Sequence, residues 1–310
     1  DSIVKVHQYA PITKNRESKI DIVDFTALKE VGAWNFSNDG SGIQTAKVMY
    51  QAMLEAVKVG KVIVAHAEDE SLLKGGVMHA GKRAEKLELP GILSVVESSQ
   101  VARDLLLAQA TGCHYHVCHI STKETVQLIR NAKSAGIHVT CEVTPHHLLL
   151  TDEDILTDSA IWKVNPPLAS KADQEALIAG LFDGTIDMIA TDHAPHTVFE
   201  KETSFATGAF GIVGLEQAFS LMYTHFVEKK IITLEKLIHL MSTYPAKIFG
   251  MVGGNLQIGE PADITVMNLD HEYVIAAKNF ESKGSNTPFL GWKVKAKTLM
   301  TFVDGKLVWG

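Results

Sequence analysis

Several features are scarce or missing in this chain of 310 residues, and each absence excludes a class of protein. No apolar run reaches the roughly 18 residues that a membrane helix needs. No basic segment followed by an apolar stretch marks a secretory signal. Lys and Arg number 29 against 36 Asp and Glu, so the net charge of -7 does not favour nucleic acid. We therefore expect a cytoplasmic protein that binds neither a membrane nor nucleic acid.

Cysteine is scarce as well. The three cysteines, Cys113, Cys118 and Cys141, contain no CxxC pair, which indicates reduced thiols in a cytoplasmic protein. Cys113 and Cys118 belong to one strand-like run at a separation of five residues, so their side chains point to opposite faces and do not pair. We expect all three to be small core residues.

Nucleotide-binding signatures are also missing, because no GxGxxG follows the first apolar run and no P-loop occurs. What the chain does have, up to about residue 250, is an alternation of short β-rich runs with helical stretches, which predicts βα units around a parallel sheet. Helical spacing of apolar residues predicts helices over 45–59 and 98–111, and Ser121 is the expected N-cap of a third helix. The predicted strands are Ile3–Tyr9, Ala33–Ser37, Lys61–His66, His114–His119, Ile137–Val143 and Ile186–Thr191.

Strands that are apolar on both faces fit either a barrel or a doubly wound sheet. Polar residues gather at the carboxyl ends of several of these strands, where barrel enzymes keep their active sites. We therefore predict a TIM-type (β/α)8 barrel of α/β class over residues 1–252. From residue 253 onward, glycine-punctuated strands and an Asp304-Gly305 hairpin turn predict a small β-sandwich domain over 253–310.

The strand ends carry the residues that could perform chemistry. Asp39 lies on a glycine-rich turn, and His66, His119 and Asp192 each end a separate predicted strand. The carboxyl ends of barrel strands converge at one mouth, and imidazole with carboxylate is a ligand set that suits Zn²⁺. The sequence therefore predicts a hydrolytic metal site.

Two alternatives remain within this set. His114 and His116 form an HxH pair that could chelate metal by itself, whereas the position at the strand end favours His119. The cluster at 142–147 either shapes the pocket or is structural, since Pro145 ends the strand pairing. Asn165 lies on a rigid turn and offers an amide to a planar polar ligand. The Gly-rich segment 210–216 suits contact between backbone and a small anion.

Six motifs carry a resemblance to a known family: ATDHAPHTVFEK (190–201), HAED (66–69), CHIST (118–122), EVTPHHL (142–148), NPPL (165–168) and FGIVGLE (210–216). In the order in which they occur along the chain, and together with GEPADITVMNL and NTPFLGWKV near the C-terminus, they resemble the bacterial class I dihydroorotases of the amidohydrolase superfamily. The resemblance covers essentially the whole chain. It implies the reversible interconversion of N-carbamoyl-L-aspartate and L-dihydroorotate in pyrimidine synthesis.

The resemblance also implies roles for individual residues. His66 and His119 resemble metal ligands, Asp192 a ligand that acts as general base and acid, and Asp39 an acid that stands where related enzymes bridge two metals with a carboxylated lysine. The implied substrate contacts are Asn165, His196 near the substrate carboxylate, and the main chain of Gly211. One or two Zn²⁺ per subunit, a homodimer, and aspartate transcarbamoylase as a partner are further implications.

One family motif is missing, because no HxHxR precedes Asp39. We expect roughly a hundred further N-terminal residues to carry it, so that this chain holds about six of the eight barrel strands and is weakly active or inactive alone. The alternatives are a catalytically inactive structural partner of a transcarbamoylase, or another cyclic amidase. Asp39 in place of a bridging lysine disfavours dihydropyrimidinase, and His196 disfavours allantoinase.

Overall fold

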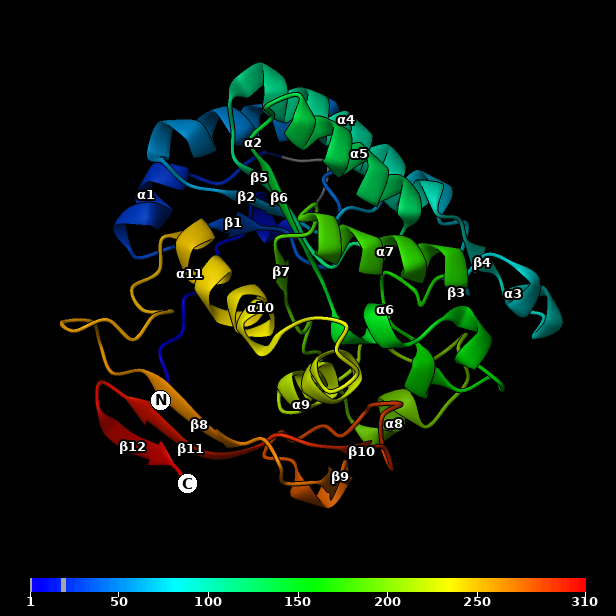
Figure 1. Cartoon of the computed structure of the whole chain (residues 1–310). Helices are drawn as coiled ribbons and strands as arrows, with labels where there is room; N and C mark the ends of the chain where they lie inside the picture. Colours follow the sequence, from blue (N-terminus) through cyan, green and yellow to red (C-terminus); the bar gives the residue numbers. More distant parts are fainter. Residues whose placement is uncertain (1, 18–20) are drawn as a thin grey trace.

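The computed structural model describes residues 2–17 and 21–310, and its centre is a parallel sheet (Figure 1). Its five strands lie in the order β1-β2-β5-β6-β7, and every neighbouring pair is parallel. Parallel neighbours need crossover connections, and helices supply most of them here. The strands are β1 (Phe36–Ser37), β2 (Ile63–Ala65), β5 (Tyr115–Val117), β6 (Val139–Val143) and β7 (Met188–Ile189).

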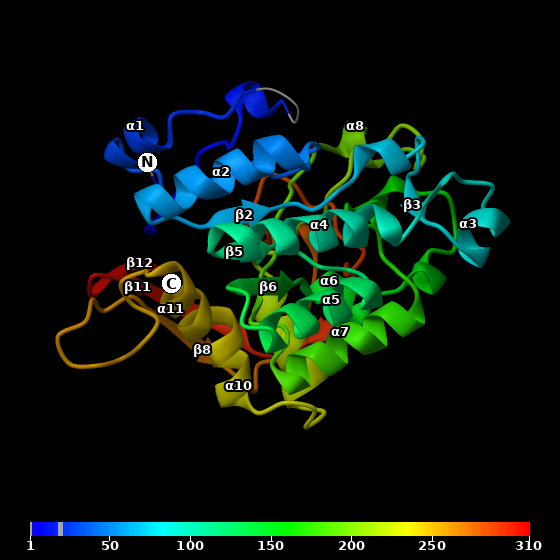
Figure 2. The same ribbon diagram turned by 90° about the horizontal axis from the view of Figure 1, so that it is seen from above.

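Helices α2, α4, α5 and α7 cover this sheet as successive neighbours, which is clearest in the view from above (Figure 2). Helix α2 shows why they form: Thr45 accepts a hydrogen bond from the Val48 N–H at its start, and Gly60 ends it at φ 68°. The α-helices are α1 (Phe25–Glu30), α2 (Ala46–Val59), α3 (Lys82–Lys86), α4 (Val95–Thr111), α5 (Lys123–Ser134), α6 (Pro145–Leu149), α7 (Lys171–Asp183), α8 (Val198–Lys201), α9 (Ala218–Met222), α10 (Leu234–Ile238) and α11 (Tyr244–Phe249).

The remaining elements are short. A parallel pair, β3 (Met78–His79) and β4 (Gly91–Ile92), lies beside α3. Single 3-10 turns occupy Lys14–Arg16, Glu70–Leu72, Asp152–Asp154, Ala160–Trp162 and Ala277–Asn279, and π turns occupy Tyr223–Val227 and His239–Thr243. Within the described chain, no helix has both the length and the apolar character needed to cross a membrane.

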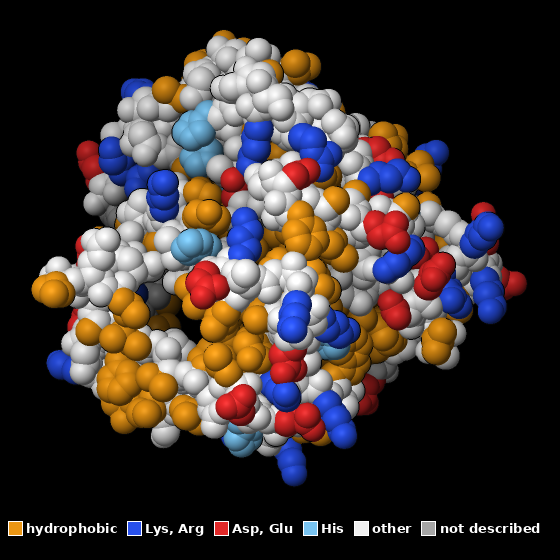
Figure 3. All heavy atoms as spheres, in the orientation of Figure 1, with side chains coloured by type: hydrophobic (Ala, Val, Ile, Leu, Met, Phe, Trp, Pro, Cys, Tyr) orange, Lys and Arg blue, Asp and Glu red, His pale blue; other side chains and the backbone are white. Residues whose placement is uncertain are grey.

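Antiparallel strands make up the C-terminal part. β8 (Ile264–Asn268), β11 (Lys297–Val303) and β12 (Lys306–Trp309) form one sheet, and β9 (Tyr273–Val274) pairs with β10 (Lys293–Val294). The predicted hairpin is confirmed, with Asp304 and Gly305 at φ 48° and 76° between β11 and β12. Hydrophobic side chains gather on the surface over this sheet, where Leu307 and Trp309 are exposed (Figure 3).

The C-terminal part also contributes to a hydrophobic cluster that contains residues of the preceding part. Phe289 and Val294 pack in it together with Met78 and Leu150. This cluster is separate from the larger one formed between the parallel sheet and its helices. The division into 1–252 and 253–310 stays a prediction.

Two predicted details need correction. The run Ile3–Tyr9 forms no strand, because most of it is exposed and only Ala10 makes a single parallel bridge to Phe36. Thr122, not Ser121, caps helix α5 by accepting from the Thr125 N–H. The helix begins at Lys123, one residue later than predicted, so Thr122 and not Ser121 stands at the N-cap position, and the Ser121 hydroxyl donates to the buried carboxylate of Glu97.

Candidate metal centre and active site

The carboxyl ends of the parallel strands bring the predicted residues to one edge of the sheet. Asp39 follows β1 by two residues, His66 follows β2 directly, and His119 follows β5 by two residues. Since β1, β2 and β5 are adjacent and parallel, their ends lie side by side. Three residues far apart in the sequence thus reach one place.

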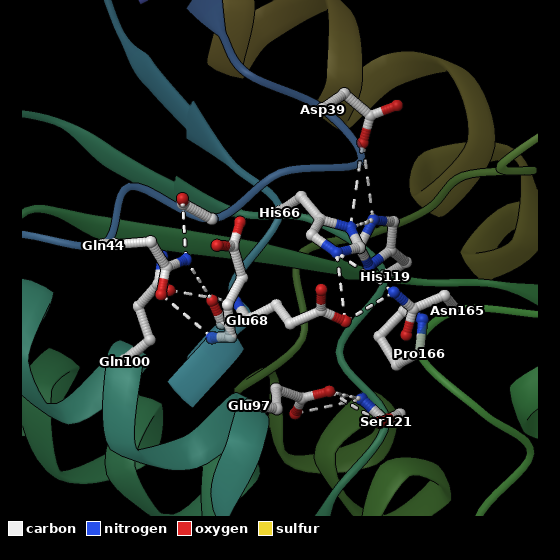
Figure 4. A network of polar contacts seen from close by, with 12 residues as sticks. Asp39, Gln44, His66, Glu68, Glu97, Gln100, His119, Ser121, Asn165 and Pro166 are labelled. Atoms are coloured by element: carbon white, nitrogen blue, oxygen red, sulfur yellow. Dashed lines mark hydrogen bonds and ion pairs between the residues drawn. The ribbon is translucent and has the colours of Figure 1, made fainter. Parts of the chain in front are cut away.

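The three side chains point toward one another (Figure 4). His66 Nδ1 lies 3.1 Å from His119 Nε2, and Asp39 Oδ1 lies 4.0 Å and 3.7 Å from these two nitrogens. Both rings are buried, whereas two thirds of the Asp39 side chain is exposed, at 66%. The cluster is therefore open to solvent on the carboxylate side.

This arrangement fits a zinc-type cation. Ligand atoms about 2.0–2.2 Å from one tetrahedral zinc lie roughly 3.3–3.6 Å from each other, close to the separations found here. His66 Nδ1 and His119 Nε2 face each other, and a proton between them is bonded to only one of the two nitrogens. A cation between them would accept the lone pairs of both nitrogens. His119 Nδ1, on the opposite side of the ring, has no hydrogen-bond partner within the described residues.

Without a cation, the cluster holds a proton. Burial disfavours a charged His119 ring, but the Asp39 carboxylate, 3.7 Å from Nε2, and the charge of Asp192 outweigh it and raise the pKa of His119 to about 9. The proximity of His119 likewise lowers the pKa of Asp39 to about 2, against the effect of burial. A metal ion must therefore displace a proton from His119.

Asp192 follows β7 and lines a cavity of about 490 Å³ together with Asp39 and His119. It is not part of the three-residue cluster. Burial raises the pKa of its carboxyl, and the negative charge of Asp39 adds to this, whereas the charge of His119 opposes it. Asp192 and His119 both have positive φ, at 45° and 33°, a strained conformation for side-chain-bearing residues that is frequent at functional sites.

Asn165 belongs to the same network. Its Nδ2 donates to Glu68 Oε2 over 2.5 Å and lies 3.5 Å from His66 Nε2 (Figure 4). Glu68 Oε2 is itself 3.8 Å from His66 Nε2. One buried carboxylate thus contacts both a predicted metal ligand and a predicted substrate contact. Burial by itself raises the pKa of Glu68, but the nearby His66 ring and the hydrogen bond from Asn165 outweigh burial, and the pKa is lowered overall.

His196 and Gly211 lie together at a second place. His196 Nε2 donates to the Phe210 carbonyl over 2.8 Å, and a Cβ on Gly211 would lie 3.0 Å from that nitrogen. The Gly211 N–H donates to the Lys163 carbonyl over 2.9 Å, so it already has a partner within the protein. Neither His196 nor Gly211 is among the described residues that line the 490 Å³ cavity. Their contact with substrate stays a prediction.

The choice between His119 and the HxH pair as metal ligands stays a prediction, but the structure places the three rings differently. His114 Nε2 and His116 Nδ1 each lie 2.8 Å from the Thr140 hydroxyl, and His119 alone of the three joins Asp39 and His66. His116 forms a second polar group with Cys118 and Glu142, in which the ligand atoms lie within 4.8 Å of one another. Cys118 is half-buried and lines the cavity, so it is not the buried core residue that we predicted.

The other two cysteines, Cys113 and Cys141, are buried, and all three cysteines are free, as predicted.

Two carboxylates beside the candidate metal ligands were not predicted from the sequence. Glu68 stands in the HAED motif two residues after His66, and that spacing was the available signal. Glu97 lies in helix α4 and accepts hydrogen bonds from the N–H and hydroxyl groups of Ser121 and Thr122, directly after His119. No sequence pattern signals Glu97, because its partners are brought to it only by the packing of α4 against β5.

Comparison with known proteins identifies close relatives. A family model described as dihydro-orotase-like matches residues 1–125. A dihydroorotase of Enterococcus faecalis is 60% identical over 309 residues, which is 100% of this chain and 72% of the relative. A dihydroorotase of Lactiplantibacillus plantarum is 58% identical over 308 residues, covering 99% of this chain and 71% of the relative.

Solved structures agree on the fold. The L-hydantoinase (dihydropyrimidinase) of Arthrobacter aurescens superposes with a TM-score of 0.85 at 27% identity, covering 99% of this chain and 70% of that one. The D-hydantoinase of Thermus sp. does so with a TM-score of 0.85 at 24% identity, again over 99% and 70%. The predicted α/β barrel class is confirmed by these neighbours.

Proposed function

The chain belongs to the dihydroorotase family, and on that premise we propose that it interconverts N-carbamoyl-L-aspartate and L-dihydroorotate in pyrimidine synthesis. The reaction is the reversible hydrolysis of a cyclic amide. The observation that supports a metal-dependent route is the cluster of Asp39, His66 and His119, with ligand atoms 3.1–4.0 Å apart.

Asp39, His66 and His119 would hold Zn²⁺, one or two ions per subunit, with Asp192 as a further ligand. Zinc at this place supplies a nucleophile from water near neutral pH and Lewis acidity for the amide carbonyl. Behind the cluster, Glu68 Oε2 lies 3.8 Å from His66 Nε2, and Glu97 accepts hydrogen bonds from Ser121, two residues after His119.

Asp192 moves the proton. Its carboxylate takes a proton from the attacking water and returns it to the leaving ring nitrogen, and in the other direction it deprotonates the ureido nitrogen. Burial and the charge of Asp39 raise the pKa of its carboxyl in the metal-free protein, and a bound Zn²⁺ would lower it again, so that the carboxylate is ionised and can accept a proton. Asn165 and His196 contact the substrate, the second near its carboxylate, and Gly211 supports the same region.

Two alternatives to this function are another cyclic amidase activity and a catalytically inactive role. Related cyclic amidases include the hydantoinases and dihydropyrimidinases that share this fold. Asp39, in place of a lysine that could bridge metals, favours dihydroorotase. A catalytically inactive partner of a transcarbamoylase is the other alternative, which the assembled cluster disfavours because ligands in such a protein are free to be lost.

Assembly and location belong to the same proposal. We propose a homodimer, with aspartate transcarbamoylase as a partner, because the family resemblance implies both. A cytoplasmic location fits the three free thiols.

The test uses the full gene product, loaded with zinc and assayed with dihydroorotate, dihydrouracil and allantoin. We expect turnover of dihydroorotate and bound zinc, and little turnover of the other two. Asp192→Asn should abolish turnover while the protein stays folded, and Asp270→Asn, in the turn after β8, serves as the matched control. Preference for another ring, or absence of both zinc and turnover, would refute the proposal.

A further inference from the structure

Two buried lysines lie behind the His196 loop and take no part in the chemistry described so far. Lys163 and Lys201 are only 4% and 3% exposed. Lys201 is the last residue of α8, and Lys163 stands two residues before Asn165. Buried lysines are rare, and those that occur are usually paired with a carboxylate.

These two have no such partner among the described contacts. Lys201 Nζ donates to the carbonyls of Lys163, Ala209 and Gly211 over 3.0, 2.9 and 2.8 Å. Lys163 Nζ donates to the carbonyls of Gly208, over 2.8 Å, and Phe205. Carbonyl groups satisfy the donors but leave both positive charges uncompensated.

Both ammonium groups lie in buried surroundings, where little solvent screens a charge. The Phe210 ring packs against Lys163 in a cation–π contact, with its centroid 4.3 Å from Nζ. Burial lowers the pKa of both ammonium groups, to about 8 for Lys201, where the charge of Lys163 adds to the effect. Holding two like charges in a poorly hydrated place is unfavourable for folding alone.

The pair is directly connected to His196. Lys201 binds the Gly211 carbonyl, and Gly211 touches the His196 ring so closely that a Cβ would lie 3.0 Å from Nε2. Asn286 joins the two segments, since its Oδ1 accepts from the His196 N–H and its Nδ2 donates to the Gly211 carbonyl. The nearest carboxylate on the loop, Glu200, is 49% exposed and 3.6 Å from His196 Nδ1, so solvent screens it.

We propose that Lys163 and Lys201 are specificity-determining residues, a buried cationic pair whose charge draws the carboxylate of an anionic ring substrate to the His196 loop. The inference rests on the proposed function, in which dihydroorotate and N-carbamoyl-L-aspartate carry carboxylates and dihydrouracil does not. A preorganised charge in a site of low polarity acts on a ligand anion more strongly than a solvated one does.

The test measures binding of orotate and its neutral isostere orotamide to the zinc-loaded full gene product by calorimetry. Lys201→Met should raise the Kd for orotate at least about tenfold, because it removes one unit charge from a poorly hydrated place, where the effective dielectric constant is low. Lys201→Arg keeps the charge and should stay within about threefold of wild type. Lys29→Met, which removes a single ammonium–carbonyl bond on α1, is the matched control and should change nothing.

Equal loss of orotate affinity in Lys201→Met and Lys201→Arg would overturn the proposal, as would a Kd in Lys201→Met within threefold of wild type. If orotamide binds, its Kd should change less than about twofold in Lys201→Met. An equal change in Kd for orotate and orotamide would also overturn the proposal. Lys163→Met, expected to act in the same direction, replaces Lys201→Met should that variant not fold. Wild-type turnover of dihydroorotate tests the proposed function separately.

Discussion

Zinc binding should release a proton from His119, and the Asp39→Asn variant tests this. The pKa of His119 is about 9 in the metal-free cluster, so at pH 7 the ring is about 99% protonated. Zinc needs the neutral ring, so binding at pH 7 should release about one proton from this residue. Apparent zinc affinity should then rise about tenfold per pH unit between pH 7 and 8.5, and level off above 9.

Asp39→Asn removes the carboxylate that, 3.7 Å from His119 Nε2, raises the pKa of that ring against the effect of burial. The pKa of His119 should fall, so the proton release at pH 7 and the slope of affinity with pH should both fall below the wild-type values. Affinity itself should also fall, because a ligand oxygen with negative charge is lost.

The assay is calorimetric titration of zinc into the metal-free protein at pH 7, in two buffers of different ionisation enthalpy. The difference in heat gives the number of protons released. Glu55→Gln, a matched loss of an exposed carboxylate on α2, should behave as wild type. A wild-type release near zero, with affinity flat from pH 7 to 8.5, would refute the proton-holding cluster.

Three further predictions concern residues around the site and in the core. Glu68→Gln keeps the size of the side chain but removes the charge 3.8 Å from His66 Nε2, so chelator competition should show zinc binding weakened about 10- to 100-fold, and unchanged affinity would contradict this. Gly211→Ala places a Cβ 3.0 Å from His196 Nε2 at a φ of 134°, and urea unfolding should show a loss of about 2 kcal/mol. A loss below about 0.5 kcal/mol would mean that the loop adjusts freely. Burial raises the pKa of Asp104 to about 6, so its contribution to stability is fully present below about pH 4 and is lost as the pH rises through 6, by up to about 3 kcal/mol. Urea unfolding of wild type and Asp104→Asn from pH 4 to 8 checks this, and parallel pH profiles would rule it out.

Much of the local structure could be predicted from the sequence because it depends on neighbours in the chain. Thr45 and Gly60 bound helix α2 through hydrogen bonds and a left-handed turn that involve only nearby residues. The Asp304-Gly305 turn forms for the same reason. The Ile3–Tyr9 run was predicted wrongly, because apolar composition does not determine whether a segment finds a surface to cover.

The site was predictable in part. Asp39, His66 and His119 were recognisable because each stands at a strand end, and parallel pairing places strand ends together. Glu97 could not be found, since its four donors belong to a segment 24 or 25 residues away in the chain.

By itself, the sequence determined the order of strands and helices, the residues available for metal and proton chemistry, and the family to which the chain belongs. These follow from short-range spacing and from identity along the chain. Only the tertiary structure decided which atoms face one another: that His66 presents Nδ1 to the cluster and Nε2 toward Glu68, and that two lysines with no counterion among the described residues lie behind His196. The physical reason is that coordination, burial and electrostatic coupling depend on distances through space, which the packing of helices against the sheet sets.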